Sequence, residues 1–553
     1  MMDLIVVNGR VLTMDPARPR AEALGITGNT IAAIGSLADV MAARKPSTRV
    51  LDARGGTVLP GLIESHMHLF PGAVELDQLS LFGISGFEAL SGKVHAYAAA
   101  NPHDTLLIAQ AADYTILGGS ETVTRQHLDR IVPDRPFLMF APDHHTAWAN
   151  TIGLERGGIL RGAEVGVGNE IVMGTDGLAS GELREGEAIE PVFQLTDKGL
   201  RYRLGLATGG DPVPPATPAE RAADKLMLQR GLAHLARHGI TSFHNMDGNP
   251  YTLSLLAELE SEGKLTARGK VPFHFKNFMD LDELGVASAM ARAYTSEKLH
   301  SGFVKVFVDG VIDSSTAMLL DDYADQPGRN CAPLFTPGHF RDVAVEADRR
   351  GLQIAVHAIG DGAVRMVLDG YEAAAKVNGT RDLRHRIEHI ELVHPDDIPR
   401  FKALGVVASM QPVHAPGMAG LPMEPTVSRI GRTRWPQAYA WRTLRDAGAR
   451  MTFGTDWPVS PVDPMLAIEC AVTRSPWAEG MPEQRQTLDE ALRSYTHDSA
   501  WVEHMEHRKG MLREGMLADM TVLSGDIECV EPGAIHTLKA TATVCDGLVV
   551  YEA

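Results

Sequence analysis

Cysteine is scarce in this sequence, and no long apolar run is present. Four cysteines occur among 553 residues, and no two of them form a CxxC pair. This spacing excludes a disulfide scaffold and a cysteine-built zinc or iron–sulfur site. No run of about 18 apolar residues occurs, so we expect no transmembrane helix. The N-terminus turns polar at Asn8 and lacks a basic region, so we expect no signal peptide and a cytoplasmic location.

Positive charge is also in short supply. The sequence has 52 Lys and Arg against 70 Asp and Glu, which gives a formal net charge of −18. Such an acidic surface disfavours nucleic acid or an anionic membrane as the main partner. We therefore expect a small-molecule substrate, and the sequence leaves a homodimer open. The hydrophobic fraction of 44% is that of a globular protein that can bury a large core.

Both ends of the chain are rich in short apolar runs separated by Gly, Asn and Pro turns, a pattern typical of β-strands. We expect strands at 4–7, 10–13, 23–27 and 30–34, and again at 519–523, 539–545 and 547–551. The simplest arrangement is one composite β-sandwich domain built from residues 1–58 and 509–553. Two separate appendages are the alternative.

The middle of the chain alternates apolar runs with helical periods, which indicates βα units and a parallel sheet. Helical periods cover 218–238, 338–350 and 395–404. Ten strand candidates lie at 57–68, 105–110, 136–141, 240–245, 271–278, 303–309, 352–357, 384–389, 406–411 and 450–456. The spacing of the later ones suits a (β/α)₈ barrel over 59–508. Because ten exceeds eight, we interpret the irregular stretch 69–215 as an insertion or lid subdomain that holds the two surplus strands.

The strongest chemical signal is the run PGLIESHMH, which ends in His66 and His68. Two histidines at i and i+2 on a strand point to the same face, so their imidazoles can converge on one metal ion. The alternative is one buried and one exposed side chain. Both histidines end an apolar run, where a barrel strand meets its catalytic face.

Three later strands also end in residues that bind metals. His357 follows an apolar run and precedes a Gly-Asp-Gly turn, and His389 ends the run RIEH. Each could instead be a hydrogen-bonded core histidine. Asp456 follows MTFGT, where a carboxylate could bind a metal and accept a proton from water. Its alternative is a turn or a helix cap.

Lys305 lies among Val and Phe in the strand FVKVFVDG. A buried ammonium is costly unless it is paired, and burial lowers its pKa and makes the amine nucleophilic. Such an amine can take up carbon dioxide as a carbamate, which could bridge two metal ions. A plain ion pair, for example with Asp309, is the alternative.

Together these segments resemble the amidohydrolase superfamily of metal-dependent hydrolases, in particular the family 3 branch with N-substituted formamide deformylase-like enzymes. The similar segments run in the same order along the chain: VVNGRVLTMD, PGLIESHMH, GTDGLASGELRE, VKVFVDG, VHAIGD, RIEHIE, SMQPVH, TFGTDWPVSP and KGMLREGMLADMTVL. The resemblance implies that the HxH strand is the first barrel strand and the Asp strand the eighth. It assigns the strands within 105–141 to the insertion.

The resemblance also implies the site. Its metal-site positions are His66, His68, Lys305, His357, His389 and Asp456. It implies one or two divalent ions per chain, with zinc the expected metal and carboxylated Lys305 the bridge if there are two. A divalent ion lowers the pKa of bound water, and Asp456 would take the proton and return it to the leaving nitrogen.

Further residues are candidates for supporting roles. Glu388, Asp361 and Asp309 could orient the ligand imidazoles. Gln411 ends the strand SMQ and could contact the substrate, and His414, three residues on, is a weaker candidate. His145, Trp148 and Trp457 are aromatic candidates for the substrate pocket, although an aromatic residue more often belongs to the core. The Gly-rich stretch 174–186 is a candidate lid.

We therefore expect a hydrolase that cleaves a non-peptide amide-type C–N bond, such as that of an N-acyl or N-formyl amine. The same site could hydrolyse a lactone, ester, carbamate or cyclic imide, or carry out a deamination. A metal-binding or ligand-binding homologue that has lost catalysis is a third alternative. The intact set of four histidines and Asp456 argues against that alternative.

Overall fold

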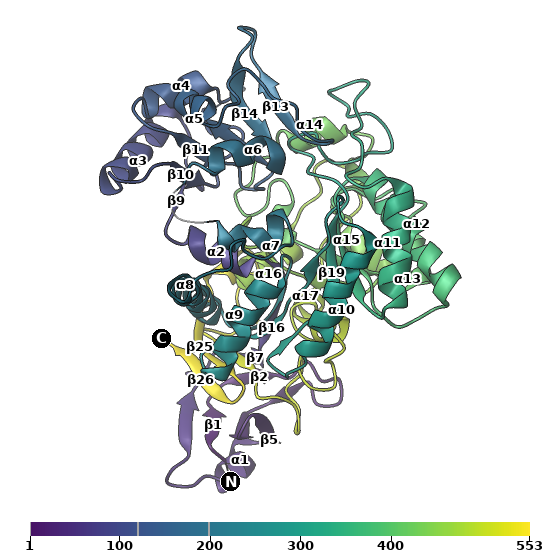
Figure 1. Ribbon diagram of the computed structural model, residues 1–553. Coiled ribbons are helices and arrows are strands. Elements are labelled where there is room, and N and C mark those ends of the chain that lie inside the picture. The colour runs from purple at the N-terminus through teal and green to yellow at the C-terminus, as the bar shows by residue number, and fades with distance from the viewer. Residues whose placement is uncertain (1, 119–120, 197–199) are drawn as a thin grey trace.

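The computed structural model describes residues 2–118, 121–196 and 200–553. Figure 1 shows three parts: a β-rich base that holds both chain ends, a central body of strands and helices, and an upper part built from the insertion. The central body contains the parallel strands and is called the parallel-strand unit below. Within the described residues no helix is long and apolar enough to cross a membrane.

Two sheets form the base. One has the order β5-β4-β1-β6, and the other has the order β26-β25-β24-β7-β2-β3. The second sheet joins both ends of the chain, because β24 pairs antiparallel with β7 at Met520 and Pro60. Side chains from both sheets, such as Leu24 and Val544, fill one core between them. The strands are β1 (Leu4–Val7), β2 (Arg10–Leu12), β3 (Arg20–Ala21), β4 (Ala23–Thr27), β5 (Thr30–Gly35), β6 (Arg49–Asp52), β7 (Thr57–Pro60), β24 (Met520–Leu523), β25 (Ala540–Cys545) and β26 (Leu548–Glu552).

The prediction of a single strand at 57–68 is wrong in one respect. The chain forms two strands there, β7 in the base and β8 (Leu62–Met67) in the parallel-strand unit. Gly61 separates them, and a Cβ at this position would lie 2.0 Å from Thr241 Oγ1. The Thr241 side chain therefore packs directly against the Gly61 backbone, where the chain passes from the base into the central body.

The parallel-strand unit consists of two sheets, with the orders β18-β16-β15-β8 and β17-β19-β20-β21-β22-β23. Beyond β23 the chain returns to β8: the Asp456 N–H donates to the His66 carbonyl at 2.8 Å, and the His68 N–H donates to the Trp457 carbonyl at 2.7 Å. The first and last predicted strands thus meet at their carboxyl ends. The strands are β15 (Ile240–Asn245), β16 (Arg268–Lys270), β17 (Phe273–His274), β18 (Leu299–His300), β19 (Phe303–Phe307), β20 (Gln353–Ala358), β21 (Arg386–His389), β22 (Val407–Met410) and β23 (Met451–Phe453).

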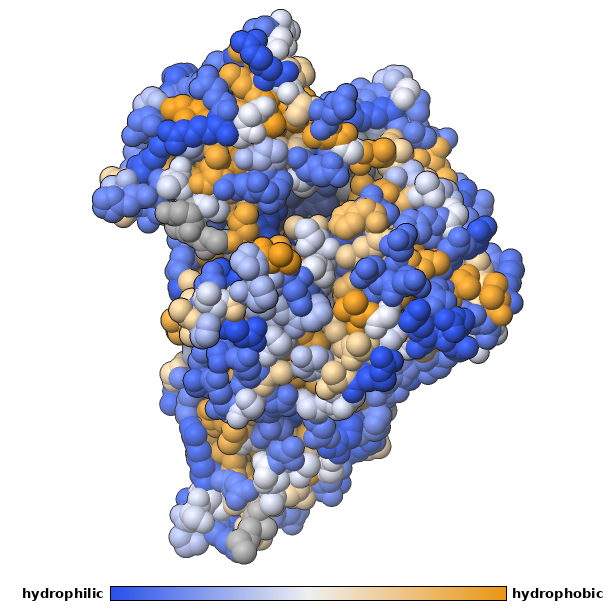
Figure 2. All heavy atoms as spheres, in the orientation of Figure 1, coloured by the Kyte–Doolittle hydropathy of each residue, from blue (hydrophilic) through white to orange (hydrophobic). Residues whose placement is uncertain are grey.

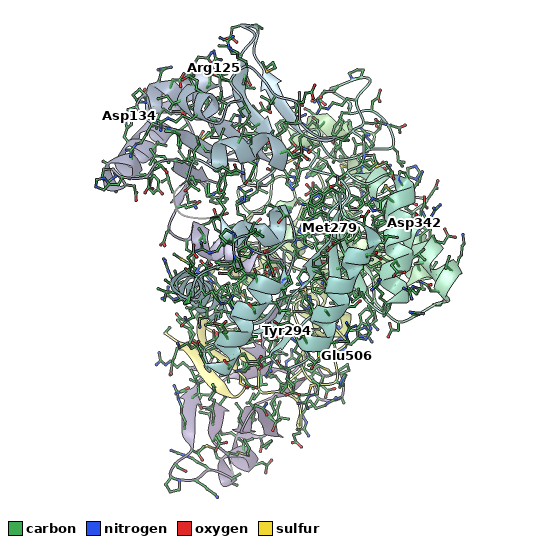
Figure 3. The ribbon with its side chains drawn as sticks, viewed as in Figure 1. Arg125, Asp134, Met279, Tyr294, Asp342 and Glu506 are labelled. Atoms are coloured by element: carbon green, nitrogen blue, oxygen red, sulfur yellow. The ribbon has the colours of Figure 1, made fainter. Side chains whose placement is uncertain are left out.

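Helices follow these strands, and several of them begin at a side-chain cap. Helix α8 (Pro218–Arg237) begins at Thr217, whose hydroxyl accepts from the Glu220 N–H while the Glu220 carboxylate reaches back to the cap. The other principal helices are α2 (Leu69–Glu75), α9 (Pro250–Ser261), α10 (Leu284–Ala293), α11 (Pro337–Arg349), α12 (Asp361–Asn378), α13 (Ile398–Leu404), α16 (Pro464–Thr473), α17 (Leu488–Ser494) and α18 (His497–Val502). Tyr294, labelled in Figure 3, directly follows α10, and Met279 lies five residues before this helix begins.

The insertion has a sheet of its own, with the order β13-β14-β12-β11-β10-β9. The two surplus strands predicted from the sequence are β10 and β11, and both lie in this sheet. The predicted Gly-rich lid is in part a strand, β14, whose Ala179 carbonyl accepts from Arg125 at 3.2 Å (Figure 3). The elements are β9 (Leu79–Ser80), α3 (Phe87–Ala100), β10 (Leu107–Gln110), α4 (Arg125–Ile131), β11 (Phe137–Phe140), β12 (Thr146–Ala149), α5 (Thr151–Arg156), β13 (Glu170–Met173), β14 (Ala179–Arg184) and α6 (Gly186–Phe193).

Candidate metal centre

Four of the predicted metal-site residues meet at the carboxyl ends of the parallel strands. His66 and His68 come from the end of β8, His389 ends β21, and Asp456 follows β23. The rings of His66 and His68 lie 5.9 Å apart and those of His66 and His389 4.7 Å apart, measured between centroids. Residues that span nearly 400 positions of sequence therefore form one cluster.

Asp456 is the centre of this cluster. Its Oδ1 lies 3.2 Å from His66 Nε2 and 3.4 Å from His68 Nε2, while His389 Nδ1 lies 3.9 Å from Oδ2. The donor atoms of His66, His68 and Asp456 all lie within 4.8 Å of one another. Burial alone would raise the pKa of Asp456, but the neighbouring His66 and His68 hold it well below its usual range.

Two carboxylates orient the paired histidines. Glu388 Oε2 lies 2.6 Å from His66 Nδ1, and Asp247 Oδ1 lies 2.9 Å from His68 Nδ1. With a divalent ion bound, each carboxylate would accept the Nδ1 proton and leave the Nε2 lone pair of each ring free for the ion. This is the arrangement by which outer carboxylates fix metal-binding histidines. The buried Nδ1 of His389 and Oδ1 of Asp456 have no hydrogen-bond partner among the described residues, which fits a divalent ion held by these groups.

His357 lies beside this cluster but is turned differently. Its ring centroid is 4.5 Å from that of His389, yet its Nε2 donates to the Gly310 carbonyl at 3.1 Å. His414 instead completes a second group of donor atoms with His389 and Asp456. The rings of His389 and His414 are stacked with centroids 6.0 Å apart. Five imidazoles therefore surround one carboxylate.

Lys305 is buried in β19 with no exposed surface, and its Nζ has no hydrogen-bond partner among the described residues. Burial lowers its pKa to about 8. The alternative of an ion pair with Asp309 is wrong, because both Asp309 oxygens accept backbone N–H groups, from Ile359, Gly360 and Met318. An unpaired, partly neutral amine is the state that carbamate formation requires.

A cavity of about 730 Å³ opens over the cluster, between the insertion and the parallel-strand unit. Figure 2 shows the surface hollowed between these two parts. The insertion reaches the site through His145, whose Nδ1 lies 2.8 Å from Glu185 Oε2 and whose ring lies 5.3 Å from that of His357. Burial would lower the pKa of His145, but the Glu185 carboxylate raises it to about 9. The insertion therefore contributes a cationic group to the cavity wall.

Three predicted pocket residues are not part of the cavity wall. Trp148 points into the insertion core against Tyr114, because β12 alternates its faces. Trp457 packs on α2, where a Cβ on Gly72 would lie 2.6 Å from its ring. Gln411 is only 2% exposed, and neither of its amide atoms has a partner among the described residues. Of the four, only His145 lines the cavity.

The predicted supporting carboxylates also differ from one another. Glu388 orients a ligand histidine. Asp309 mainly accepts backbone N–H groups and lies 3.8 Å from His357 Nε2. Asp361 has no hydrogen bond to an imidazole among the described residues; its Oδ1 instead accepts the Leu320 N–H at 2.9 Å and ties the segment between β19 and α11 to the start of α12. Its prediction as an orienting group is therefore wrong.

Sequence reasoning missed Asp247 and Glu185 and gave little weight to His414. Asp247 lies two residues after β15, where a polar residue near the carboxyl end of a strand was a usable signal. Glu185 directly follows β14 in a backbone conformation with φ of +65°, and no sequence pattern marks that. A Cβ on Gly310 would lie 2.2 Å from Glu185 Oε1, so this carboxylate depends on a contact between distant segments.

Comparisons with known proteins agree with this geometry. The amidohydrolase family matches residues 49–551. Protein LONG AFTER FAR-RED 3 of Arabidopsis thaliana is 30% identical, covering 94% of this chain and 87% of that protein. N-substituted formamide deformylase of Arthrobacter pascens is 26% identical, covering 100% and 99%. An uncharacterized metal-dependent hydrolase from Pyrococcus horikoshii superposes with a TM-score of 0.70 at 24% identity, covering 96% and 99%.

The family match covers most of the chain, and the parallel strands bring the metal-binding groups together beneath a cavity. The fold is thus of the α/β metallo-hydrolase type. The chain belongs to the amidohydrolase family and is a metal-binding hydrolytic enzyme that acts on carbon–nitrogen bonds other than peptide bonds.

Proposed function

We propose that the enzyme hydrolyses an amide-type C–N bond of an N-acyl or N-formyl amine, with zinc as its metal. The observation that carries the proposal is the position of Asp456, whose Oδ1 faces both His66 Nε2 and His68 Nε2 at the floor of the cavity. The full-length similarity to N-substituted formamide deformylase of Arthrobacter pascens supports this substrate class.

The chain's own residues have distinct parts in this reaction. A divalent ion, when bound, supplies activation of water and polarisation of a carbonyl. His66, His68 and His389 would hold the ion, because their inward nitrogens lie around Asp456. The low pKa of Asp456 keeps it ionised, so it can accept the proton of the attacking water and then return it to the leaving nitrogen.

Two finer features belong to the proposal. The two parallel sheets, joined by the bonds between β8 and the segment after β23, would form one (β/α)₈ barrel. Lys305 would bind a second ion after its neutral amine adds to carbon dioxide, which forms an N–C bond and releases one proton from nitrogen. Lys305→Met is then expected to reduce the metal content from about two ions per chain to about one.

The cavity rim supports a substrate with an apolar substituent. Phe82, Val167 and Phe278 line the cavity, yet they remain 46%, 64% and 68% exposed. Large exposed apolar side chains that gather at one opening are typical of binding surfaces. A volume of about 730 Å³ also exceeds what a formyl group needs, so the excess space would hold the substituent on nitrogen or on the acyl carbon.

A hydrolysis screen tests the proposal. Zinc-loaded enzyme is incubated with formamides and N-acyl amines of increasing apolar size, and with lactones and carbamates in parallel. We expect amide hydrolysis that improves with apolar size. Hydrolysis of lactones alone would contradict the proposed substrate class.

Asp456→Asn tests the role of the carboxylate. We expect it to lower kcat by about 10²–10⁴-fold, because the proton acceptor is lost. The matched control is Asp361→Asn, which changes another buried carboxylate that lies outside the cavity wall and keeps its acceptor for the Leu320 N–H. Unchanged turnover in Asp456→Asn would remove this residue from its proposed role.

A further inference from the structure

A chain of buried polar groups runs through the parallel-strand unit, and Arg386 is its centre. Arg386 is 1% exposed and lies on β21, two residues before Glu388. Its Nε donates to Glu388 Oε1 at 2.5 Å, and its Nη2 donates to the Ser65 carbonyl and to Ser409 Oγ, both at 2.6 Å. One guanidinium thus connects three strands, β8, β21 and β22.

The same guanidinium sets the proton positions of two histidines. Its Nη1 lies 3.0 Å from His244 Nδ1, and because arginine only donates, His244 Nδ1 must be the acceptor. The proton of the neutral His244 ring is then on Nε2. On the other side, Arg386 donates to both oxygens of Glu388, and Glu388 Oε2 lies 2.6 Å from His66 Nδ1, whose proton it accepts.

Glu503, the residue after α18, lies at the far end of this series of buried polar contacts. Its Oε1 lies 3.3 Å from His244 Nε2 and 2.7 Å from Lys509 Nζ, and its Oε2 lies 3.3 Å from His300 Nε2. The Glu503 side chain is 1% exposed. Gln353, the first residue of β20, donates to the Val502 carbonyl at 2.8 Å. Glu503 therefore lies near the amino ends of the parallel strands, opposite the cavity.

We propose that Glu503 is a positioning residue of the metal centre: through His244 and Arg386 it holds Glu388, and thereby His66, in the orientation that binds the ion. The physical reason is electrostatic: the Glu503 carboxylate, 3.3 Å from His244 Nε2, attracts the ring proton to that nitrogen. Nδ1 is then left as the acceptor that Arg386 requires. Without that acceptor the guanidinium would reorient toward other oxygens, and its hydrogen bonds to Glu388 would change.

The proposal rests on the metal centre of the proposed function and not on its substrate, so it is tested without turnover. Glu503→Gln keeps the shape of the side chain and removes its charge. We expect its affinity for Zn²⁺, measured by competition with a chromophoric chelator, to fall about tenfold. We also expect the visible spectrum of the Co²⁺-loaded protein to shift, because the His66 ligand is reoriented.

Asp519→Asn is the control, since it breaks another buried ion pair, with Arg268, in which the side chains are only 4% and 1% exposed. It is expected to leave metal affinity and the Co²⁺ spectrum unchanged. Wild-type affinity and spectrum in Glu503→Gln, or equal changes in both variants, would overturn the proposal. A wild-type chain that binds neither metal would instead overturn the proposed function.

His244→Leu keeps the inference open to test if Glu503→Gln fails to fold. The leucine side chain removes the acceptor for Arg386 and the contact with Glu503 together. We expect the same loss of affinity and the same spectral shift as for Glu503→Gln. A His244→Leu protein with unchanged affinity and spectrum would equally overturn the role of Glu503.

Discussion

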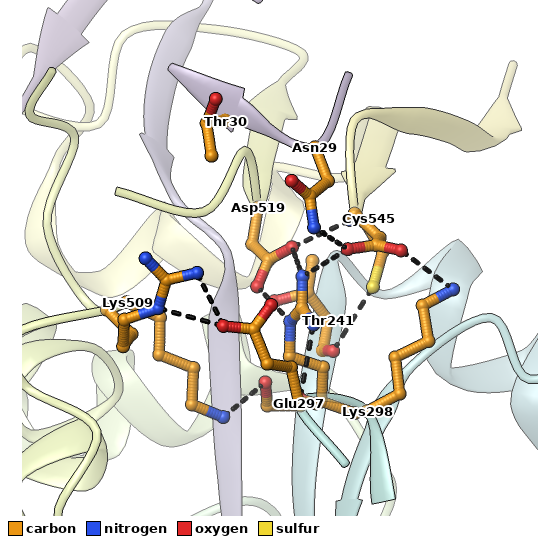
Figure 4. A network of polar contacts seen from close by, with 12 residues as sticks. Asn29, Thr30, Thr241, Glu297, Lys298, Lys509, Asp519 and Cys545 are labelled. Atoms are coloured by element: carbon orange, nitrogen blue, oxygen red, sulfur yellow. Dashed lines mark hydrogen bonds and ion pairs between the residues drawn. The ribbon is translucent and has the colours of Figure 1, made fainter. Parts of the chain in front are cut away.

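The metal centre and the junction around Arg268 are both buried and both rich in charge, but they differ in whether their buried polar atoms have hydrogen-bond partners. At the junction, Arg268 donates to Asp519 through Nε at 2.7 Å and through Nη2 at 3.0 Å, and Nη2 also reaches Asp546 at 2.9 Å. Figure 4 shows this network, in which Asp519 and Glu297 lie among closely spaced partners. At the metal centre, Lys305 Nζ, His389 Nδ1 and Asp456 Oδ1 lack hydrogen-bond partners among the described residues.

The difference shows what each region does. A buried polar atom without a partner lowers stability, so it persists where a ligand or a reaction needs it. The junction, in which each carboxylate has partners, connects the base to the parallel-strand unit. The comparison predicts that damage to the junction lowers stability and leaves catalysis intact. Damage to the metal centre should abolish catalysis and cost only the stability that the bound ion supplies.

Asp519→Asn is the strongest test of the junction. Removing the Asp519 charge leaves Arg268 with Asp546 as its one carboxylate partner among the described residues, so we expect a loss of about 3 kcal/mol in the free energy of unfolding. Thermal and urea unfolding measure this loss. The kcat of the remaining folded protein should match the wild type, and a large fall in kcat would break the comparison.

Metal removal tests how much the bound ion at the metal centre contributes to stability. An ion that binds only the folded chain stabilises it by about 2.7 kcal/mol when its free concentration is 100 times Kd. We therefore expect a chelator to lower the Tm of the wild type and added Zn²⁺ to restore it. Asp519→Asn should show the same shift from its lower starting Tm. A His66→Ala/His68→Ala variant should show almost none.

Lys270 provides a smaller test, because it is a buried cation that belongs to neither arrangement. Its Nζ donates to the neutral amide oxygen of Gln353 at 2.7 Å, and burial lowers its pKa to about 7 from 10.5. Between these values the unfolded chain binds more protons than the folded chain. The stability of the wild type relative to Lys270→Met should therefore rise with pH above about 7, by at most about 1.4 kcal/mol per pH unit. Unfolding measured at pH 7.5 and 9 checks this, and a falling difference would contradict the low pKa.

Much of the fold follows from local patterns. The apolar runs at 4–7 and 23–27 became β1 and β4 with the predicted bounds, because alternation and turn residues suffice to define short strands. The division of 57–68 at Gly61 could not be predicted, since it depends on Thr241 of another strand. The six-stranded sheet of the insertion was predicted only in part, because its strand pairing also depends on contacts between segments that are distant in the sequence.

The candidate site shows a similar division. His66, His68, His389 and Asp456 were predictable, because a strand end places a side chain at a defined edge of a parallel sheet. His357 was predicted as a ligand position, but the carbonyl of Gly310 decides which of its nitrogens is free. Trp148 and Trp457 were indistinguishable from pocket residues by composition alone, since an aromatic ring suits a core as well as a wall.

The sequence by itself therefore determined which residues can bind a metal and at which strand ends they occur, since residue chemistry and strand periodicity are local properties. Tertiary structure alone decided that Glu388 and Asp247 orient the ligands, that Glu185 brings His145 to the cavity, and that Lys305 stays unpaired. These outcomes depend on distances between segments up to several hundred residues apart, and such distances are set by the packing of the whole chain.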